Sequence, residues 1–384
     1  MIAIKAGEVR TMGPEGRIED AVVLVKDDKI SRIGRDLEIP PGAEVYDYSD
    51  RIITPGLIDA HTHLGIGEEG LGWEGRDYNE MTSPVTPELR AIDAINPEDQ
   101  GLEDAREHGI TTVMAGPGSA NVIGGECLAL KTGGQVIDDM IVKNPVGIKA
   151  AFGENPKRVY KEKNQSPSTR MAVAALLRKT FVETENYLAK KNSKKDDEPF
   201  ERDLKYEALI PVLQGELPLK THAHRADDIM TALRIAREFS LKLSVEHCTE
   251  GHKVAKELAK AGVPAVVGPS MTTRSKVEVR ERDFKTAAVL AEAGVTVAIM
   301  SDHPVVPVHN LTLYAALTAK AGLPREEAFR AITINPARIL GIDDRVGSLE
   351  EGKDADLVVF SEDPFQMSAE VKAVFISGKK LDEV

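Results

Sequence analysis

The segment Pro55-Gly56-Leu57-Ile58-Asp59-Ala60-His61-Thr62-His63 reads as a short apolar strand that ends in two histidines one residue apart. Alternate residues of a strand face the same side, so His61 and His63 can point at one metal ion while Thr62 points away. Imidazole is a common ligand of zinc and similar divalent ions. A lone His-x-His pair is also common on exposed strands and loops. Other parts of the sequence are therefore needed to decide between a metal site and an ordinary surface pair.

The region from about residue 55 to residue 341 alternates strand-like runs with helical patterns. The runs predicted as strands are 109–114, 146–150, 219–222, 242–247, 263–267 and 295–300. Helical patterns cover 227–239, 252–261 and 284–293, and each is followed by a strand after a short loop or glycine turn. This alternation predicts parallel βα units of an α/β protein, and the length fits a (β/α)8 TIM-like barrel. An open doubly wound sheet is the alternative, but no Gly-x-Gly-x-x-Gly turn follows a first strand.

The two ends of the chain read as short β-strands without intervening helices. Examples are 21–25 and 30–33 near the start, and 355–360 and 371–378 near the end. β-rich ends around a different middle predict a small β-sandwich domain built from both termini, with the barrel as an insertion. The expected division is residues 1–54 and 342–384 for the β-sandwich domain and residues 55–341 for the barrel.

Composition argues against several classes of partner. The chain has 49 Lys plus Arg against 62 Asp plus Glu, and the resulting net charge of −13 does not suit nucleic acid or an anionic membrane surface. Cys127 and Cys248 are the only cysteines, which is no disulfide framework and fits a reducing compartment. No window approaches the roughly 20 apolar residues of a membrane span, and no signal peptide is recognisable at the start. We therefore expect a cytoplasmic protein with a small-molecule substrate; a homo-oligomer is left open.

The ends of the predicted strands test the metal hypothesis, because a βα barrel builds its active site at the C-terminal ends of its strands. The first strand ends in His61 and His63, two later strands end in His222 and His247, and the last is followed by Asp302. Histidine and carboxylate groups that meet in this way are typical ligands of divalent metals. The sequence therefore predicts a metal site at the mouth of the barrel.

The whole pattern resembles the amidohydrolase superfamily, in its imidazolonepropionase-like and prolidase-like branch. The matching residues extend over nearly the whole chain and are the segment 55–63, His222, His247, Asp302, Asn335-Pro336-Ala337 and Val346-Gly347-Ser348-Leu349-Glu350-Glu351-Gly352-Lys353-Asp354-Ala355-Asp356-Leu357. Each piece alone is unspecific, whereas the combination is highly specific.

The resemblance implies a divalent metal, with zinc expected, as one or two ions. It places His61, His63 and Asp302 on one ion and His222 and His247 on the other. In the superfamily a lysine at the end of the fourth strand is often carbamylated and bridges two metals, and by resemblance Lys149 is the candidate. The competing layout is a single ion bound by His61, His63, one strand-end histidine and Asp302.

Other side chains are candidates for substrate contacts. His224 shares the alternation of His222, and Arg158 and Lys276 lie in loops after strands, where a cation could bind a substrate carboxylate. Each basic residue, taken singly, is as readily a member of a surface ion pair. Glu126 lies in a glycine-rich stretch that reads as a loop near the substrate. A long loop at 65–97 is expected to cover the site.

Three functions remain open at the level of sequence. The first is hydrolysis of an amide C–N bond in a small cyclic amide, a short peptide or an N-acyl amino acid, in which Asp302 moves the proton of a metal-activated water. The second is deamination of a heterocycle, but deaminase relatives tend to carry a glutamate three positions after the strand-end histidine, where this chain has Arg225. The third is a barrel scaffold without catalysis, which would be expected to lose its ligands.

Overall fold

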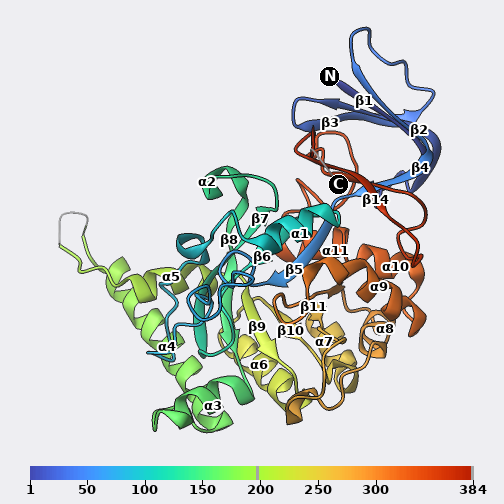
Figure 1. Ribbon diagram of the computed structural model, residues 1–384. Helices are drawn as coiled ribbons and strands as arrows, with labels where there is room; N and C mark the ends of the chain where they lie inside the picture. Colours follow the sequence, from blue (N-terminus) through green and yellow to red (C-terminus); the bar gives the residue numbers. More distant parts are fainter. Residues whose placement is uncertain (196–198, 382–384) are drawn as a thin grey trace.

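The computed structural model describes residues 1–195 and 199–381 and contains two sheets with surrounding helices (Figure 1). The barrel sheet consists of β5 (Leu57–Thr62), β6 (Ile110–Ala115), β7 (Ile123–Lys131), β8 (Ile141–Ala151), β9 (Leu219–Ala223), β10 (Leu243–His247), β11 (Ala265–Val267) and β12 (Val297–Ile299). The sheet of the chain ends consists of β1 (Ile2–Arg10), β2 (Arg17–Lys26), β3 (Lys29–Arg35), β4 (Glu44–Pro55), β13 (Leu357–Phe360), β14 (Val371–Ile376) and β15 (Lys379–Lys380).

Eleven α-helices and four short 3-10 helices are found among the described residues. The α-helices are α1 (Gln100–Glu107), α2 (Ile137–Met140), α3 (Glu154–Glu162), α4 (Arg170–Asn192), α5 (Leu204–Leu213), α6 (Ala226–Glu238), α7 (Ala255–Ala261), α8 (Lys285–Glu292), α9 (Leu311–Lys320), α10 (Arg325–Arg330) and α11 (Ile334–Leu340). The 3-10 helices are η1 (Ala91–Ala94), η2 (Gly251–Lys253), η3 (Val277–Val279) and η4 (Val308–Asn310).

The barrel strands lie side by side in chain order, from β5 to β12, which confirms the predicted mixed α/β barrel fold. β8 to β12 are all parallel, and the predicted helices between β9 and β12 are present as α6, α7 and α8. The expected helix at 252–261 is shorter than predicted, because η2 forms its first part. Parallel strands of this kind bring their C-terminal ends to one edge of the sheet, where the predicted ligands stand.

One strand departs from the expected pattern of parallel βα units. β7 runs antiparallel to both β6 and β8. Glu126 lies inside this strand and is paired with Ile148, so its predicted placement in a loop is wrong. The preceding residues Gly124 and Gly125 suggested a loop, but Gly125 instead lets the backbone of Leu89 approach the strand, since a Cβ on Gly125 would stand 2.5 Å from the Leu89 oxygen.

The first and last strands of the barrel are linked by a connecting segment. Ile58 N donates to the Ile332 oxygen at 2.8 Å, and Ile299 N donates to the Ala331 oxygen at 2.9 Å. The Asp59 carboxylate adds a second link, because it accepts hydrogen bonds from the backbone N and hydroxyl of Ser301, at 2.9 and 2.6 Å. The sheet is thereby nearly closed into a barrel.

Apolar side chains pack on both faces of the barrel sheet. One large core lies between the strands and the helices, as for Leu177 of α4 and Ile229 of α6, which are fully buried. A smaller core, which includes Ile58, Val266 and Leu340, joins strand residues to α11. The polar groups at the C-terminal ends of the strands are thus held by apolar packing around and beneath them.

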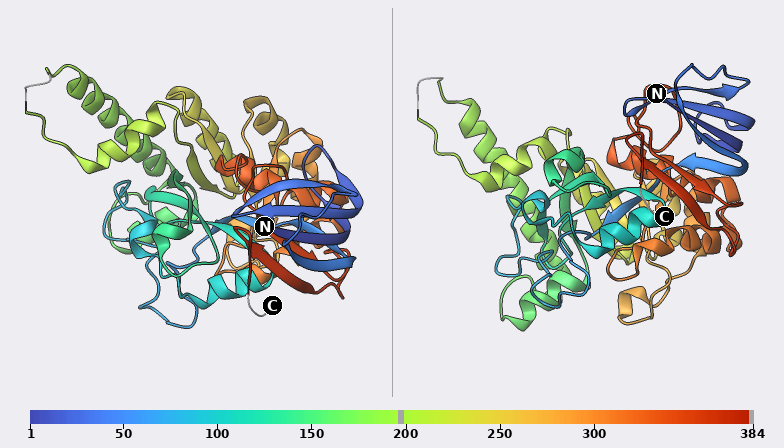
Figure 2. Two further views of the ribbon diagram at one scale, coloured as in Figure 1. Left: turned by 90° about the horizontal axis from the view of Figure 1, so that it is seen from above. Right: turned by 45° about the horizontal axis from the view of Figure 1, so that its top comes forward.

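The two chain ends form one separate seven-stranded sheet, in the order β15-β14-β13-β4-β1-β2-β3. The predicted β-rich unit built from both termini is thereby confirmed, while the residue limits 1–54, 55–341 and 342–384 stay a prediction. The sheet curls around its own core, in which Val23 of β2 and Phe375 of β14 belong to one cluster. Figure 2 shows this sheet on the opposite side of the barrel from α4 and α5, which project outward.

A stretch rich in Lys, Asp and Glu, residues 190–203, separates most of α4 from α5 in the sequence. α4 ends at Asn192 and α5 begins at Leu204, and residues 196–198 of the stretch lie outside the described residues. Among the helices of the described chain, none combines the length and the apolar character that crossing a bilayer requires.

Candidate metal centre

A cavity of about 710 Å³ opens at the C-terminal ends of the barrel strands. All nine side chains selected from the sequence line it, and they are His61, His63, Lys149, Arg158, His222, His224, His247, Lys276 and Asp302. A larger hollow of about 1010 Å³ runs along α8, α10 and the loops beside them, but none of these nine residues lines it. The reactivity of a site depends on which side chains line it and not on its volume. The smaller cavity is therefore the candidate site.

Asp302 stands between the two histidines of the first strand. Its Oδ1 atom lies 3.3 Å from Nε2 of His61 and 3.4 Å from Nε2 of His63. Burial opposes a charge on Asp302, but the neighbouring His247, His61 and His63 hold the pKa of this carboxyl well below its ordinary value. Asp302 therefore remains an anion amid imidazoles, which is the donor set that a divalent ion prefers.

The ring nitrogens turned away from the cavity are held by hydrogen bonds. Nδ1 of His61 lies 2.8 Å from the Glu246 carboxylate, Nδ1 of His63 lies 2.7 Å from the Gly116 oxygen, and Nδ1 of His247 lies 3.0 Å from the Gly268 oxygen. An imidazole that donates from Nδ1 presents its lone pair at Nε2. Such outer hydrogen bonds fix the orientation of a metal-binding histidine and select its tautomer.

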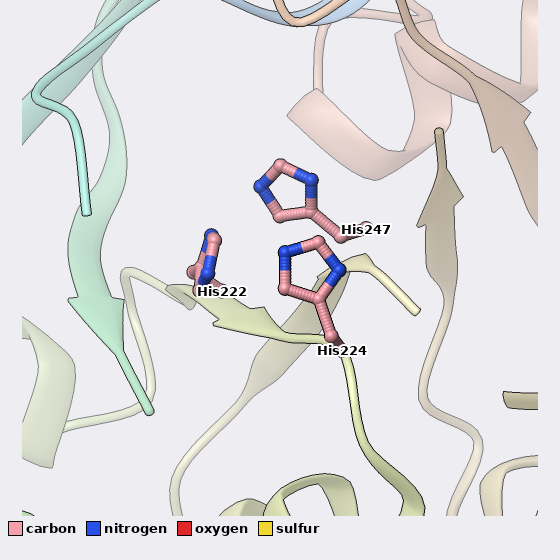
Figure 3. Close-up of side chains that lie close together, drawn as sticks. All are labelled: His222, His224 and His247. Atoms are coloured by element: carbon pink, nitrogen blue, oxygen red, sulfur yellow. The ribbon is translucent and has the colours of Figure 1, made fainter. Parts of the chain in front are cut away.

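A second group comprises His222 and His224 at the end of β9 and His247 at the end of β10. Figure 3 shows the three rings gathered around one space, and one ligand atom from each lies within 4.8 Å of those of the other two. Burial lowers the pKa of all three rings well below the ordinary value, so they are neutral. Both nitrogens of His222 and Nε2 of His224 are buried and lack a hydrogen-bond partner in the described chain. Unpartnered lone pairs of this kind fit a bound metal ion.

Irregular backbone turns two of these side chains toward the cavity. His247 has a φ of +70° and Asp302 a φ of +56°, both in the left-handed region that costs a residue with a side chain free energy. The pairing of β5 with β6 is also shifted between Asp59 and Thr62, next to His61. Bulges and strained residues often re-aim side chains beside functional sites.

Lys149 reaches the same place from β8. Its Nζ atom lies 3.1 Å from Nε2 of His61, and its side chain is buried. Burial lowers the pKa of Lys149, so its amine loses a proton more readily than that of an exposed lysine, and the neutral amine is the form that can react with carbon dioxide.

Glu246, which the sequence pattern did not single out, lies behind the ring of His61. Its carboxylate is fully buried and accepts hydrogen bonds from His61 Nδ1 at 2.8 Å and from the Ser244 hydroxyl at 2.5 Å. Burial alone would raise the pKa of Glu246, but His61 and the charges of Lys220 and Lys149 lower it to about 2. The available signal was a pair of charged residues, Lys220 and Glu246, at inner positions of two short parallel strands that are buried throughout.

The mouth of the cavity is rich in cations. Arg158 of α3 is exposed and makes no ion pair with the described residues, whereas Nζ of Lys276 is 2.7 Å from the Glu278 carboxylate and 3.0 Å from Oδ1 of Asn155. Arg282, another residue missed in the sequence, lines the same wall and donates to the Ser270 oxygen at 3.0 Å. Nε of Arg282 is buried and has no hydrogen-bond partner among the described residues, so Arg158 and Arg282 are the cations of this wall without an ion pair there.

The long loop after β5 contributes part of the cavity wall. Tyr78 stacks on His63 with ring centroids 5.2 Å apart, and Asn79 also lines the cavity. Trp73 of the same loop is 85% exposed and lies outside the lining. The loop thus reaches the site through Tyr78 and Asn79.

Two residues considered from the sequence lie outside the cavity lining. Arg225 is turned to Asp227, with which it makes hydrogen bonds of 2.8 and 2.9 Å. Glu126 is half-buried near Arg90, and burial raises the pKa of its carboxyl. Neither reaches the group formed by the histidines and Asp302.

Comparison with known proteins agrees with this geometry. The model of the amidohydrolase family matches residues 52–381. Amidohydrolase tasK of Hapsidospora irregularis is 29% identical over 93% of this chain, which spans 39% of that relative's length. An imidazolonepropionase of Idiomarina loihiensis is 27% identical, with 90% of this chain and 87% of that protein covered. The crystal structure of an amidohydrolase from Thermotoga maritima is 44% identical and superimposes with a TM-score of 0.97, with all of both chains covered.

The family model matches far more than half of the chain, and the resemblance seen in the sequence is thereby confirmed. The chain belongs to the amidohydrolase family and is a hydrolase that acts on carbon–nitrogen bonds.

Proposed function

We propose that this protein hydrolyses the amide bond of a small cyclic amide, a short peptide or an N-acyl amino acid with the help of a bound divalent ion, zinc being expected. The observation that carries the proposal is the meeting of Asp302 with His61 and His63 in one buried cavity, at 3.3 and 3.4 Å. When bound, such an ion would lower the pKa of a water molecule and polarise the substrate carbonyl. His61, His63 and Asp302 would hold it.

Asp302 is the residue proposed to move the proton. As a buried anion it can accept the proton of the attacking water and then deliver it to the leaving nitrogen. The two histidines keep its Oδ1 atom within the group of ligands, and its side chain is largely buried. His224, which lines the same cavity, can contact the substrate oxygen in the tetrahedral state.

The mouth of the cavity is proposed to bind a substrate carboxylate. The Arg158 guanidinium is free of protein ion pairs among the described residues, and a guanidinium matches a carboxylate in shape and charge. Lys276 adds positive charge to the same wall, although Glu278 neutralises part of it. An anionic substrate such as an N-acyl amino acid or a dipeptide has both an amide bond for the proposed metal centre and a carboxylate for the basic wall.

The alternatives have less support. Deamination would need a proton shuttle at the position of Arg225, and that side chain is directed to Asp227 and not into the cavity. A scaffold that had lost catalysis would have no need to retain three buried histidines with unpartnered or metal-directed nitrogens, since each costs free energy to bury.

The test is a substrate screen of the metal-analysed protein with cyclic amides, N-acyl amino acids and Xaa-Pro or Xaa-Arg dipeptides, read out by release of a free amine or carboxylate. Asp302→Asn should reduce kcat by about 10²–10⁴-fold, the usual contribution of a positioned acid or base. Asp283→Asn, an exposed change on the loop before α8, should leave kcat unchanged. Retained activity in Asp302→Asn would contradict the proton-transfer role, and ammonia release from purines or pyrimidines would favour deamination.

A further inference from the structure

We propose that residues 269–283 form a lid over the candidate site and that Glu278 is the positioning residue that holds this lid closed. The proposal goes beyond the proposed function, because it concerns access to the cavity and not the chemistry within it. The segment connects β11 to α8, and its residues Met271, Lys276 and Arg282 line the cavity. A movement of this segment therefore changes the wall of the cavity.

The first argument is the path of the segment. In the barrel sheet, β10 and β9 lie between β11 and β8. The segment that follows β11 nevertheless contacts α3, which follows β8, because Nζ of Lys276 donates a hydrogen bond to Oδ1 of Asn155 at 3.0 Å. Between these points Oε1 of Glu278 comes within 3.7 Å of Nε2 of His224, which directly follows β9. The segment thus crosses the C-terminal strand ends at which the candidate site lies.

The second argument is the position of the Glu278 carboxylate, which is buried at the start of α3. Its Oε2 atom accepts a hydrogen bond from the backbone N of Glu154 at 2.9 Å, and its Oε1 atom lies 2.7 Å from Nζ of Lys276. Gly153 leaves room for the carboxylate, since a Cβ there would stand 2.7 Å from Oε2. The φ of Gly153 is +84°, which disfavours any residue with a side chain. The start of α3 is thus shaped to receive Glu278.

The third argument is that the rest of the segment is weakly attached to the barrel. Within residues 269–283 only Glu278 and Val279 are buried. The side chains of Arg274 and Arg282 donate hydrogen bonds to backbone oxygens of the segment itself, at 2.7 and 3.0 Å. Segments with few buried apolar contacts are the ones that open at low free-energy cost. The attachment of the lid therefore depends strongly on Glu278.

A second carboxylate opposes the closed state. A Cβ on Gly153 would stand 3.1 Å from Oδ2 of Asp228, on the same position that approaches Oε2 of Glu278. Burial raises the pKa of Asp228, and the charge of Glu278 raises it further. Arg170 offsets part of this repulsion, since its Nε atom is 2.9 Å from Oδ1 of Asp228. Attraction and repulsion thus act on the same carboxylate, which lets the lid open and close.

The test is limited digestion of the full-length protein with trypsin, with the cleavage sites identified by mass spectrometry. Trypsin cuts after Arg274 and Arg280, which are exposed residues of the lid. Glu278→Ala should be cut there about 10–100-fold faster than the unaltered protein, because the closed state loses hydrogen bonds to a charged group. Glu278→Gln should show a smaller acceleration, since its amide oxygen still accepts the hydrogen bond from the Glu154 backbone.

Two further variants keep the outcome decisive. Gly153→Ala fills the space of the Glu278 carboxylate without changing the lid, so it should also accelerate cleavage. The double variant Gly153→Ala/Glu278→Ala should be cut little faster than either single variant, because both changes remove the same contact. Glu281→Ala is the matched control in the same segment. It removes a half-exposed pair with Lys253 and should change the cleavage rate by less than about fivefold.

Kinetics separates positioning from a mere loss of folded protein. With a substrate found in the screen, Glu278→Ala should raise KM about 10–100-fold and leave kcat nearly unchanged, because saturating substrate closes the lid again. A variant that only folds less well would instead lose kcat at an unchanged KM, since less active enzyme would be present.

Two results would overturn the proposal. One is equal cleavage of Glu278→Ala and the unaltered protein after Arg274 and Arg280. The other is a Glu281→Ala protein that is cut as fast as Glu278→Ala. If Glu278→Ala is cut throughout the chain, it has unfolded globally, and Glu278→Gln then gives the decisive comparison. The digestion needs no substrate, so a lid that opens as expected in a protein that hydrolyses no amide would reject the proposed function alone.

Discussion

Glu246 is a single residue on which the orientation of a proposed ligand depends. It is fully buried, yet it is charged, and it accepts hydrogen bonds from both His61 and Ser244. A carboxylate behind a metal-binding histidine raises the basicity of the ring and fixes its direction. Glu246 thus links the interior of the barrel to the ion proposed to lie between His61, His63 and Asp302.

Replacing Glu246 by alanine should lower the affinity for the ion proposed at His61, His63 and Asp302 by about 10–100-fold, because His61 would lose the partner of its Nδ1 atom. Glu246→Gln should have a smaller effect, since an amide oxygen still accepts that hydrogen bond although its charge is gone. Competition of the protein with a coloured chelator measures both affinities. Glu257→Ala, an exposed change on α7, is the control, and equal affinity of Glu246→Ala and the unaltered protein would exclude the positioning role.

The residues of the candidate site could be selected from sequence because strand ends meet in a barrel. His61, His222 and Asp302 are far apart in the chain, and the structure places all three in one cavity. Their roles as ligands stay predictions. Glu246 could not be selected in the same way, because it adjoins His247 and simple alternation turns neighbours to opposite faces. Only the left-handed backbone at His247 lets both contribute to one side of the barrel.

At the level of elements, β7 is the strand that sequence patterns did not reveal. Gly124 and Gly125 interrupt its apolar run, and glycine pairs are more typical of loops than of strands. The strand is nevertheless held, since Glu126 N donates to the Leu89 oxygen at 2.8 Å and both neighbours in the sheet pair with it. Pairing with distant strands, which a local pattern cannot contain, overrides the local preference. The helices α6 and α8 were predictable because their signal is local.

Gly125→Ala should destabilise the protein by about 1–3 kcal/mol through this strand, since overpacking of a tight site has that typical cost. The residue has a φ of +135°, and a Cβ would stand 2.5 Å from the Leu89 oxygen, in the loop that carries Tyr78 to the site. Urea unfolding measures the change, and proteolysis of residues 65–97 should become faster.

Gly124→Ala is the matched control for this change. A Cβ there would meet Pro117 and Lys149 side chains at 3.2 and 3.4 Å, without a backbone atom among these nearest contacts. It should therefore cost less than Gly125→Ala. Equal stability of the two variants would show that the contact with Leu89 does not hold the loop.

At the level of the whole molecule, a buried ionic cluster joins the barrel to the sheet of the chain ends. Lys131, at the end of β7, pairs with Asp356 and lies 2.9 Å from the Asp354 carboxylate, both just before β13. Asp354 also binds Arg345 at 2.8 Å and pairs with Lys29 of β3. The cluster thus links residues that are more than 200 positions apart. The β-strands predicted at both ends of the sequence indicate that the two ends form one sheet. They do not indicate that an ionic cluster attaches this sheet to the barrel.

Lys131→Met should destabilise the protein by about 3–5 kcal/mol, because the buried Asp356 loses the lysine it pairs with and Asp354 keeps two cations of its three. The side chain keeps a similar length, so the loss is one of charge and not of volume. The free energy of unfolding is the measurement. Arg178→Met, which breaks the half-exposed pair with Glu238, should cost about 1 kcal/mol or less. Similar losses in the two variants would mean that the cluster does not join the two parts.

The same cluster predicts how stability depends on pH. Burial opposes the charge of Asp354, but Lys131, Lys29 and Arg345 lower its pKa from 3.8 to about 2. A carboxyl with a lower pKa in the folded state stabilises that state above its unfolded pKa and loses this contribution as pH falls toward its folded pKa. This lowering of the pKa from 3.8 to about 2 corresponds to roughly 2–3 kcal/mol at neutral pH.

Asp354→Asn should therefore be less stable than the unaltered protein at pH 7, and the difference in free energy of unfolding should stay constant down to about pH 5. Below about pH 4 the difference should shrink, because the unaltered protein then loses the contribution that the variant never had. Asp344→Asn, an exposed change in the same connection, is the control. Urea unfolding at pH 7, 5, 4 and 3 gives the comparison. A difference that stays constant down to pH 3 would mean that Asp354 does not depend on its three cations, and the attachment of the two sheets would then rest on apolar packing instead.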